Sequence, residues 1–390
     1  MMQNSGCVQR SITVLGATGS IGTSTLDIVA RHPERFRVEA LTANGNARKL
    51  AELAIRFNAS YVALSDPAHF SILQEALNGT GIECAAGVEA VTEAARRNSD
   101  MVMSAITGSA GLAPTMAAIE RGSKILLANK EALVCAGELM KKAVLENRAV
   151  LLPVDSEHSA IFQVFDDKGR SGIHSLVLTA SGGPFRGWTA QQMKAVTLKE
   201  ALNHPRWSMG AKITVDSASM MNKGLELIEA SYLFDMPEDR IDVVVHPQSI
   251  VHSMVNYIDG SVLAQLGEPD MRTPIAYAMG WPERLRTPVE PVSLARLGQL
   301  TFEEPDEKNF PCLALARQAL RAGGSASVVL NAANEVAVDA FLNERIHFLD
   351  IASFVEDALA SIQPGACSSI DEVISLDREV RNSVKACIKA

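Results

Sequence analysis

A chain of 390 residues is long enough for two or three domains, each with a hydrophobic core of its own. Its composition, 47% hydrophobic and 21% charged residues, is that of an ordinary globular protein. The net charge of −9 argues against a nucleic-acid-binding protein, and no apolar run approaches the ~18 residues that cross a bilayer.

The cysteines and the N-terminus indicate the compartment. The six cysteines show no C-x-x-C spacing, which is typical of reduced thiols in the cytosol; they are Cys7, Cys84, Cys135, Cys312, Cys367 and Cys387. About ten residues precede the first predicted strand, and they lack the apolar region of a signal peptide. We therefore expect a cytoplasmic protein, in a bacterial cytosol.

The first motif is a glycine-rich turn. An apolar strand over Ser11–Leu15 leads into GATGSIG (residues 16–22), and a helical pattern follows over Thr23–Arg31. Strand, glycine turn and helix in this order are the context of a dinucleotide-binding site, where the helix N-terminus receives a pyrophosphate. The G-x-x-G-x-x-G spacing is only moderately specific, and a purely structural turn is the alternative.

Alternating strands and helices continue to residue 150 and predict a doubly wound parallel sheet. The further strands are expected at Arg37–Ala43, Tyr61–Leu64, Asp100–Ala105 and Lys124–Ala128. The second strand ends without the acidic residue that binds the ribose of NAD. Because Arg48 and Lys49 lie just beyond, the sequence favours NADP, unless these two are simply solvated helix residues.

Polar residues follow two of the apolar strands. Lys130, in Asn129-Lys130-Glu131, stands where a substrate oxygen is within reach, although a helix cap is an equally simple interpretation. The run Ala149–Val154 ends in Asp155-Ser156-Glu157-His158. If this segment is extended, Asp155 and Glu157 project from the same face, with their Cα atoms about 6.5 Å apart. They can then hold one Mg²⁺ or Mn²⁺ ion together. A helix start at Asp155 or Ser156 is the alternative.

Two loops in the middle of the chain carry candidate site residues. Ser181, in TASGGPF, offers a hydroxyl beside exposed amides, as an anion-binding turn does, or it belongs to a plain tight turn. The segment NHPRWSMG combines an aromatic residue, a cation and hinge glycine, and we expect residues 204–210, called the lid below, to close over a ligand. A surface loop with a packed Trp207 is the alternative.

The most informative stretch is KITVDSASMMNKGLELIEA (residues 212–230). We expect a short strand over Ile213–Val215 and a helix from about Ser219. Ser219, Asn222, Lys223 and Glu226 would then share one helix face, as a phosphate grip with a third metal carboxylate. A surface ion pair between Lys223 and Glu226 is the alternative.

The rest of the chain is predicted in three parts. Strands at Asp242–Val245, Val251–Ile258 and Ser261–Leu266 suggest an antiparallel sheet edge that pairs with a second copy in a homodimer, with His252 as a sheet or interface residue. Residues 286–310 resemble a linker, and residues 311–390 a helical bundle. The expected domains are an α/β Rossmann-like domain (1–150), an α+β catalytic domain (151–285) and this bundle.

Together these motifs resemble 1-deoxy-D-xylulose 5-phosphate reductoisomerase of the non-mevalonate isoprenoid pathway. The resemblance runs through nearly the whole chain and rests on GATGSIG, ANKEAL, PVDSEHSAIFQ, TASGGPF, NHPRWSMG and VDSASMMNKGLELIEA. It implies that the sugar phosphate is rearranged and then reduced by NADPH to 2-C-methyl-D-erythritol 4-phosphate. Many members carry a basic residue after the second strand, where this chain reads Ala43-Asn44-Gly45-Asn46.

The resemblance also implies roles for individual residues. One Mg²⁺ or Mn²⁺ ion would be held by Asp155, Glu157 and Glu226, and these would be catalytic together with Lys130 and His204. The sugar phosphate would contact Lys130, Ser156, Glu157, Ser181, His204, Ser217, Asn222, Lys223 and Glu226. NADPH would contact Thr18, Gly19, Ser20, Ile21, Asn44, Gly45, Asn46, Asn129, Glu131 and Gly210.

Two other functions fit parts of the sequence. A semialdehyde or homoserine dehydrogenase would share the nucleotide domain, but it would not need three carboxylates and a phosphate grip. A semialdehyde enzyme would also need a nucleophilic cysteine, and none of the six lies in a convincing catalytic setting. A non-enzymatic NADP-binding regulator is the second, and turnover of the sugar phosphate would exclude it.

Overall fold

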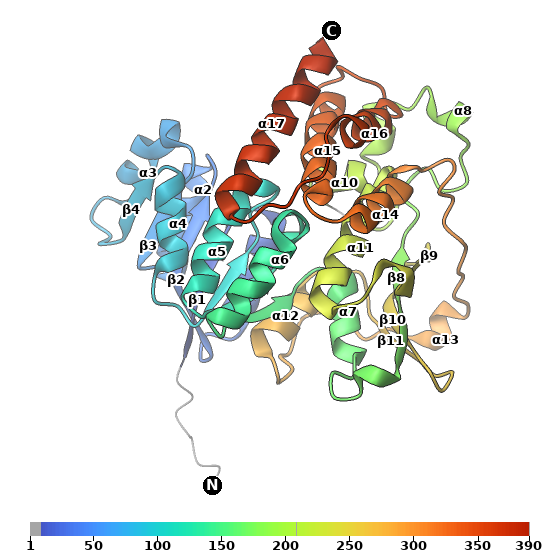
Figure 1. Ribbon diagram of the computed structural model, residues 1–390. Helices are drawn as coiled ribbons and strands as arrows, with labels where there is room; N and C mark the ends of the chain where they lie inside the picture. Colours follow the sequence, from blue (N-terminus) through green and yellow to red (C-terminus); the bar gives the residue numbers. More distant parts are fainter. Residues whose placement is uncertain (1–8, 208, 390) are drawn as a thin grey trace. The chain divides into compact units, whose positions relative to one another are not determined.

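The computed structural model describes residues 9–207 and 209–389 (Figure 1), so that Cys7 and the lid residue Ser208 lie outside the described residues. The chain forms two compact units. The first comprises the described part of Met1–Asn129 with Met140–Asp155 and Met271–Pro288. The second comprises Lys130–Leu139, Ser156–Asp270 and the described part of Val289–Ala390. The four-part division drawn from the sequence stays a prediction.

The first unit is built on a seven-stranded sheet in the order β4-β3-β2-β1-β5-β6-β7, in which all paired strands are parallel. The strands are β1 (Arg10–Leu15), β2 (Phe36–Ala43), β3 (Tyr61–Leu64), β4 (Glu83–Ala86), β5 (Met101–Ser104), β6 (Lys124–Leu127) and β7 (Val150–Pro153). The predicted Rossmann-like parallel sheet is therefore confirmed. The sequence missed only β4, because this edge strand is half-exposed and reads ECAA, without a run of large apolar residues.

Helices cover this sheet (Figure 1), most of them in blue and cyan, with α6 in green and α12 in gold. They are α1 (Ser20–Arg31), α2 (Ala47–Phe57), α3 (Phe70–Leu77), α4 (Val88–Arg96), α5 (Leu112–Glu120) and α12 (Arg272–Gly280), together with the C-terminal part of α6 (Lys130–Glu146). Asn46 caps α2 by accepting the main-chain N–H of Lys49, and Asn58 ends this helix in the left-handed conformation. These capping residues therefore fix where the helix after β2 begins and ends.

The second unit holds a mixed four-stranded sheet in the order β11-β10-β8-β9. The strands are β8 (Ile173–Ala180), β9 (Ile241–Val245), β10 (Val251–Tyr257) and β11 (Val262–Leu266). β10 runs antiparallel to both β8 and β11, whereas β8 and β9 are parallel. The predicted antiparallel edge is confirmed, and β11 forms it.

The helices of the second unit pack against this sheet and against one another. They are α7 (Ser156–Val164), α8 (Ala190–Met193), α9 (Leu198–Ala201), α10 (Ala211–Ala218), α11 (Met221–Phe234), α13 (Leu294–Leu297), α14 (Cys312–Ala322), α15 (Ala326–Leu342), α16 (Asp350–Ser361) and α17 (Ile370–Lys389). α15 is buried almost all round, because α10, α14, α16 and α17 surround it. The predicted C-terminal helices are therefore confirmed. No helix in the described part of the chain is long and apolar enough to cross a membrane.

One element differs from its prediction. Residues Ile213–Val215, expected as a strand, belong to helix α10. Their β-branched side chains favour a strand locally, but Val215 is fully buried in the core and Thr214 donates to the carbonyl oxygen of Gly210 one turn earlier. Met220, in the left-handed conformation, separates α10 from α11, so Ser219 ends the first of these helices instead of joining the polar face of the second.

Candidate active site

The acidic motif lies where a strand gives way to a helix. β7 ends at Pro153 and α7 begins at Ser156, so Asp155 directly precedes the helix and Glu157 lies in its first turn. The expectation of an extended segment through Glu157 is wrong, and the helix-start alternative describes the local fold. The helix dipole favours a carboxylate at this position. The hydroxyl of Ser156 donates to Glu157 over 2.6 Å and fixes its orientation.

Helix α11 contributes the second group of polar residues. Asn222, Lys223 and Glu226 lie within its first two turns, and Lys223 and Glu226 are buried. One oxygen from each of Asp155, Glu157 and Glu226 lies within 4.8 Å of the others. An oxygen-only set of this kind matches the ligands that Mg²⁺ and Mn²⁺ prefer. The sequence prediction that these three carboxylates converge agrees with this geometry.

Two ammonium groups balance these carboxylates. Nζ of Lys223 lies 2.9 Å from Glu157 and also contacts Glu226, while Nζ of Lys130 lies 3.0 Å from Glu226 and 2.8 Å from Oδ1 of Asn222. Burial alone would lower the pKa of Lys223, but the two carboxylates raise it above its ordinary value, so the side chain stays charged. Three carboxyl groups therefore lie together with two ammonium groups, and their oxygens are a donor set that suits a divalent cation.

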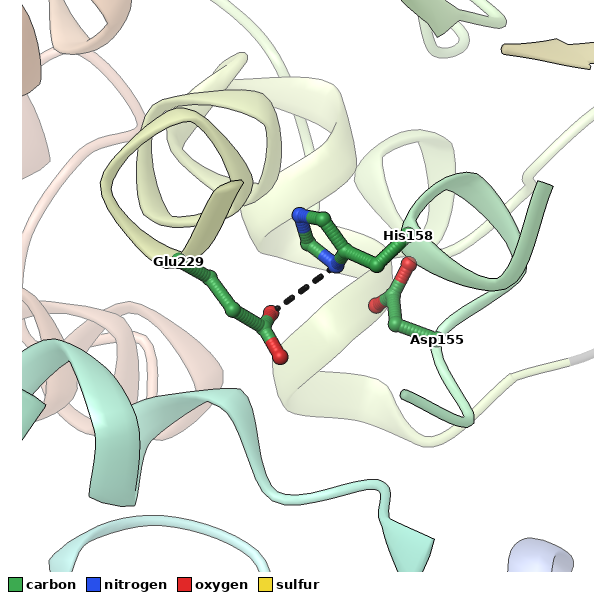
Figure 2. Close-up of side chains that lie close together, drawn as sticks. All are labelled: Asp155, His158 and Glu229. Atoms are coloured by element: carbon green, nitrogen blue, oxygen red, sulfur yellow. Dashed lines mark ion pairs between the residues drawn. The ribbon is translucent and has the colours of Figure 1, made fainter. Parts of the chain in front are cut away.

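A second acidic group shares Asp155 with the first. It contains His158 and Glu229, whose Nδ1 and Oε2 atoms lie 3.2 Å apart (Figure 2). Both side chains are almost completely buried, and Nε2 of His158 donates to the main-chain oxygen of Glu226 over 2.9 Å. Since both imidazole nitrogens already have contacts inside the protein, we interpret this pair as a support behind Glu226. The side chain of Glu157, 19% exposed, faces outward instead.

The Ser181 loop lies against the first residue of the lid. Nδ1 of His204 accepts the main-chain N–H groups of Arg206 and Trp207, so the ring proton resides on Nε2, which donates to Oγ of Ser181 over 2.9 Å. The same Oγ accepts the N–H of Gly183. With two donors directed at its oxygen, Ser181 has its hydroxyl proton to offer to an anion.

Ser217 belongs to the same neighbourhood. Gly183 has a φ of +66°, and a Cβ atom at this position would lie 2.8 Å from the main-chain oxygen of Ser217. The glycine therefore allows the turn after β8 to approach the end of α10 closely. This approach brings the Ser181 loop and Ser217 of α10 together, as a shared phosphate contact requires.

The described part of the lid contacts the sheet. The rings of Trp207 and His252 lie 6.2 Å apart, and Arg206 donates to the carbonyl oxygen of Pro247. Sequence analysis treated His252 only as a sheet or interface residue. Its buried side chain on β10, facing the lid, makes it a further candidate, and the alternation of β10 gave no signal for this because the Trp207 contact spans distant segments.

The glycine turn of the first unit has the geometry of a nucleotide site. Gly16 has a φ of +85°, and Gly22 allows helix α1 to pack on the turn, because a Cβ atom there would lie 2.3 Å from the oxygen of Gly16. Gly19 precedes α1, and Thr18, Ser20 and Ile21 surround the first helical turn. The N–H groups of that turn have no helical acceptor and suit a pyrophosphate.

The other predicted cofactor residues are spread over both units. Asn44 accepts the hydroxyl of Ser65, Gly45 lies beside the His69 ring, and Asn46 caps α2. Asn129 is buried and donates to Gly108. Glu131, in the first turn of α6, pairs with Lys212 over 2.8 Å, and Gly210 precedes α10. None of these contacts tests a cofactor role.

Comparisons with known proteins address the family. Three family models match successive parts of the chain. The model of 1-deoxy-D-xylulose 5-phosphate reductoisomerase matches residues 12–137, that of its C-terminal domain residues 151–234, and a DXP reductoisomerase C-terminal domain model residues 266–383.

Full-length relatives decide the assignment. The 1-deoxy-D-xylulose 5-phosphate reductoisomerase of Rhodospirillum centenum is 57% identical over 381 residues, which cover 98% of this chain and 95% of that protein. The reductoisomerase of Rhodopseudomonas palustris strain BisB18 is 55% identical over 383 residues, covering 97% and 94%. The chain belongs to the 1-deoxy-D-xylulose 5-phosphate reductoisomerase family.

Solved structures of this family share the fold. The reductoisomerase from Zymomonas mobilis in complex with NADPH matches with a TM-score of 0.92 and 50% identity, over 98% of this chain and all of that one (100%). A DOX-P reductoisomerase in complex with NADPH, fosmidomycin and magnesium matches with a TM-score of 0.93 and 45% identity, over 97% and 98% of the two chains.

Membership of the reductoisomerase family removes the two alternative functions. The chain is an enzyme of this family, not a regulator. Four of the described thiols also lack the lowered pKa that a nucleophilic cysteine of a semialdehyde dehydrogenase needs. Burial raises the pKa of Cys312 to about 12 and that of Cys135 well above its ordinary value. Desolvation also raises the pKa values of Cys84 and Cys367.

Proposed function

We propose that this chain converts 1-deoxy-D-xylulose 5-phosphate to 2-C-methyl-D-erythritol 4-phosphate, with NADPH as reductant and one Mg²⁺ or Mn²⁺ ion. The observation that carries this proposal is the convergence of oxygens from Asp155, Glu157 and Glu226 beside the ammonium group of Lys223. The family supports it, and one related structure holds NADPH, fosmidomycin and magnesium together.

The metal is assigned to Asp155, Glu157 and Glu226. When bound, the ion polarises the oxygens of the substrate and NADPH supplies the hydride. The chain's own residues orient two of these carboxylates, because Ser156 and Lys223 contact Glu157, and Lys130 contacts Glu226. Both ammonium groups belong to long side chains that can turn toward an anionic substrate.

The phosphate of the substrate is assigned to Ser181, Ser217, Asn222 and Lys223. The Ser181 hydroxyl donates a hydrogen bond, because its oxygen already accepts from Gly183 and His204. Lys223 adds a buried positive charge, and Asn222 lies one residue before it on α11. Charge-assisted contacts of this kind favour the dianion over a neutral sugar.

The lid excludes water from the reacting atoms in this proposal. His204 is held by Ser181 at one end, and Trp207 packs toward His252. A closed lid lowers the local dielectric and strengthens every charge interaction inside the site. NADPH is assigned to the turn of Thr18, Gly19, Ser20 and Ile21, while the contacts at Asn129, Glu131 and Gly210 stay predictions.

The deciding experiment is turnover of synthetic 1-deoxy-D-xylulose 5-phosphate by the purified chain. We expect loss of NADPH absorbance that requires Mg²⁺ or Mn²⁺, stops on chelation and returns when metal is added back. The product should be identified as 2-C-methyl-D-erythritol 4-phosphate by NMR. Absence of NADPH oxidation with either metal would refute the proposed function.

We further propose that the enzyme is a homodimer formed through β11. Val262, Leu263 and Leu266 on this edge strand are 54%, 48% and 37% exposed, an apolar edge that isolated chains seldom leave uncovered. Leu263→Lys should produce monomers in analytical ultracentrifugation. Ile55→Lys, which changes a similarly exposed residue on α2, should leave the mass unchanged, and a monomeric unmodified chain would refute this proposal.

We also propose a cytosolic location. The described cysteines, Cys84, Cys135, Cys312, Cys367 and Cys387, are all free thiols, which is the usual state in a reducing compartment. Fractionation of cells expressing the tagged chain should recover it with the cytosolic enzymes.

A further inference from the structure

A partly buried cation, whose side chain is 20% exposed, joins two helices at positions next to proposed site residues. Nζ of Lys212, on α10, lies 2.8 Å from Oε1 of Glu131 on α6 and 2.7 Å from Oδ2 of Asp216 one turn further along α10. Glu131 and Asp216 are 6% and 1% exposed. One ammonium group therefore bridges two carboxylates that are shielded from water.

The charges of this bridge are complementary. Burial alone would lower the pKa of Lys212, but Asp216 and Glu131 raise it well above its ordinary value. Burial would likewise raise the pKa of Glu131, yet the ammonium group lowers it. Lys212 and Glu131 are thus ionised, and removing the cation would leave two buried carboxyl groups without the ammonium group that joins them.

Each of the two carboxylates is adjacent in sequence to a residue of the proposed active site, so the bridge can affect the positions of both site residues. Glu131 directly follows Lys130, whose ammonium group contacts Glu226 and Asn222. Asp216 directly precedes Ser217, which lies against Gly183 of the Ser181 loop. A shift of either carboxylate moves the adjacent residue, because Glu131 and Lys130 share the first turn of α6, and Asp216 and Ser217 share the last turn of α10.

The bridge extends into the C-terminal helices. Nδ2 of Asn334, on α15, donates to the other oxygen of Asp216 over 2.8 Å. Asn334 is completely buried and lies one residue before Glu335, which pairs with Arg381 of α17. The C-terminal helices thereby fix the end of α10.

We propose that Lys212 is a positioning residue of the reductoisomerase reaction, acting through Glu131 on Lys130 and through Asp216 on Ser217, with Asn334 anchoring Asp216 to the C-terminal helices. This proposal rests on the proposed function for its kinetic readout. The ammonium group of Lys212 contacts Glu131 and Asp216, which are neither metal nor phosphate residues of the proposed site. The α10 helix begins directly after the lid, so the bridge also fixes the base of the lid.

The test compares Lys212→Met with Arg317→Met as a matched control. Arg317, on α14, also bridges two carboxylates, at 2.5 Å from Glu238 and 3.2 Å from Glu307, and adjoins no proposed site residue. Both variants should melt at lower temperature. Only Lys212→Met should lose activity, with kcat/KM for the sugar phosphate reduced roughly tenfold to a hundredfold through both a higher KM and a lower kcat. Lys212→Arg, which keeps the charge, should recover part of this loss.

A second readout does not depend on turnover. Inorganic phosphate, titrated calorimetrically into the full chain with Mg²⁺, should bind Lys212→Met several-fold more weakly than the unmodified chain and Arg317→Met. If the unmodified chain fails to turn over the sugar phosphate, the proposed function falls, and phosphate affinity alone decides the positioning role. An unchanged phosphate affinity in Lys212→Met overturns the proposal, as does an unchanged kcat/KM.

A milder variant covers the case in which Lys212→Met does not fold. Asn334→Ala removes one hydrogen bond from Asp216 and keeps the Lys212 bridge. It should lower kcat/KM in the same direction by a few-fold while Asn343→Ala, at the exposed end of α15, has no effect. Equal kinetics in Asn334→Ala and Asn343→Ala would overturn the proposal.

Discussion

The imidazole of His204 donates from Nε2 to the hydroxyl oxygen of Ser181 over 2.9 Å, while its Nδ1 accepts two main-chain N–H groups of the lid. Only the neutral ring can do both, because a protonated Nδ1 is no longer an acceptor. The fold of the lid is therefore tied to the charge state of one histidine that touches the proposed phosphate site.

This relationship predicts an acid limit to activity. Burial lowers the pKa of His204 below its ordinary value near 6.5. The stability that comes with the neutral ring is present above about pH 6.5 and is lost as the pH falls through the lowered folded-state pKa. We expect kcat/KM to fall with it, since protonation expels the two N–H donors from Nδ1.

The check is a pH profile of kcat/KM for the unmodified chain and for His204→Asn, which cannot titrate. The variant should be less active at neutral pH and should lack the acid decline assigned to His204. His174→Asn, at an exposed position of β8, serves as the control and should keep the full profile. Persistence of the same acid decline in His204→Asn would assign it to another group.

If the three carboxylates hold one metal ion, Glu226→Gln should lose turnover but keep its affinity for NADPH. This change removes one of the three carboxylates that lie within 4.8 Å of each other but keeps the size of the side chain. Turnover should collapse at limiting Mg²⁺, whereas NADPH affinity, measured by fluorescence titration, should stay close to that of the unmodified chain. Near-normal activity at limiting Mg²⁺ would exclude a site made of three carboxylates.

Alanine at Gly183 should weaken binding of the sugar phosphate through a packing clash and not through backbone strain. Gly183 and Gly187 have φ values of +66° and +80°, so alanine costs about 1–2 kcal/mol of strain at either position. Only at Gly183 would the new Cβ atom meet a neighbour, the oxygen of Ser217 at 2.8 Å, since the space beside Gly187 is open. Gly183→Ala should raise KM for the sugar phosphate at least several-fold, and Gly187→Ala should leave it unchanged. Equal KM values in the two variants would contradict a shared phosphate site.

The sequence predicted the parts of this fold that depend on local patterns. Strand β3, for example, is an apolar run (YVAL) between Ser60 and Ser65, so its position was evident. Helix α10 was not evident from the sequence, because Ile213, Thr214 and Val215 have a strand-like local preference. Burial against α11 and α15 overrides this preference. Local preference and tertiary packing disagree there, and packing decides.

The residues of the site also fall into those that a local sequence pattern reveals and those that only the fold reveals. Asp155 and Glu157 were singled out because they interrupt an apolar run, and Glu226 because it shares a polar helix face with Asn222 and Lys223. Their assignment to one metal ion rested on the resemblance to the family. The contact of Lys212 with Glu131 joins residues 81 positions apart, and that of Asn334 with Asp216 joins residues 118 apart. Lys212 directly precedes a strand-like segment and Asn334 occurs in an ordinary helical pattern, so only the folded chain identifies the partner of each.

If the lid closes over the substrate, ligand binding should change the tryptophan fluorescence of the chain. The chain has three Trp residues, and Trp207 is the one in the lid, half-buried beside His252. Binding of a phosphonate substrate mimic should change the emission of the unmodified chain as the indole moves out of water. Trp207→Phe should lose most of this response. An identical response in that variant would exclude Trp207 from the moving segment.

The last prediction concerns how the enzyme selects NADPH over NADH. The second strand ends in Ala43-Asn44-Gly45-Asn46, which has neither the acid of an NAD enzyme nor the basic residue of many relatives. The side-chain oxygens of Asn44 and Asn46 already accept hydrogen bonds from Ser65 and from the start of α2. A positive group must therefore come from elsewhere if the 2′-phosphate is to be bound by charge.

Arg48, in the first turn of α2, is the residue best placed to supply it. It is exposed and has no ion pair among the described residues, whereas Lys49 is engaged by Glu52 over 3.1 Å. A hydrogen bond to a charged group contributes ~1.5–3 kcal/mol, about a ten- to a hundredfold effect on binding. Arg48→Ala should thus raise KM for NADPH by about this factor and leave KM for NADH nearly unchanged. Lys49→Ala, its neighbour, should have a much smaller effect on either cofactor. If Arg48→Ala weakens both cofactors equally, or neither, the 2′-phosphate is recognised by main-chain amides and by Asn44 and Asn46, whose side-chain amide groups can donate to it.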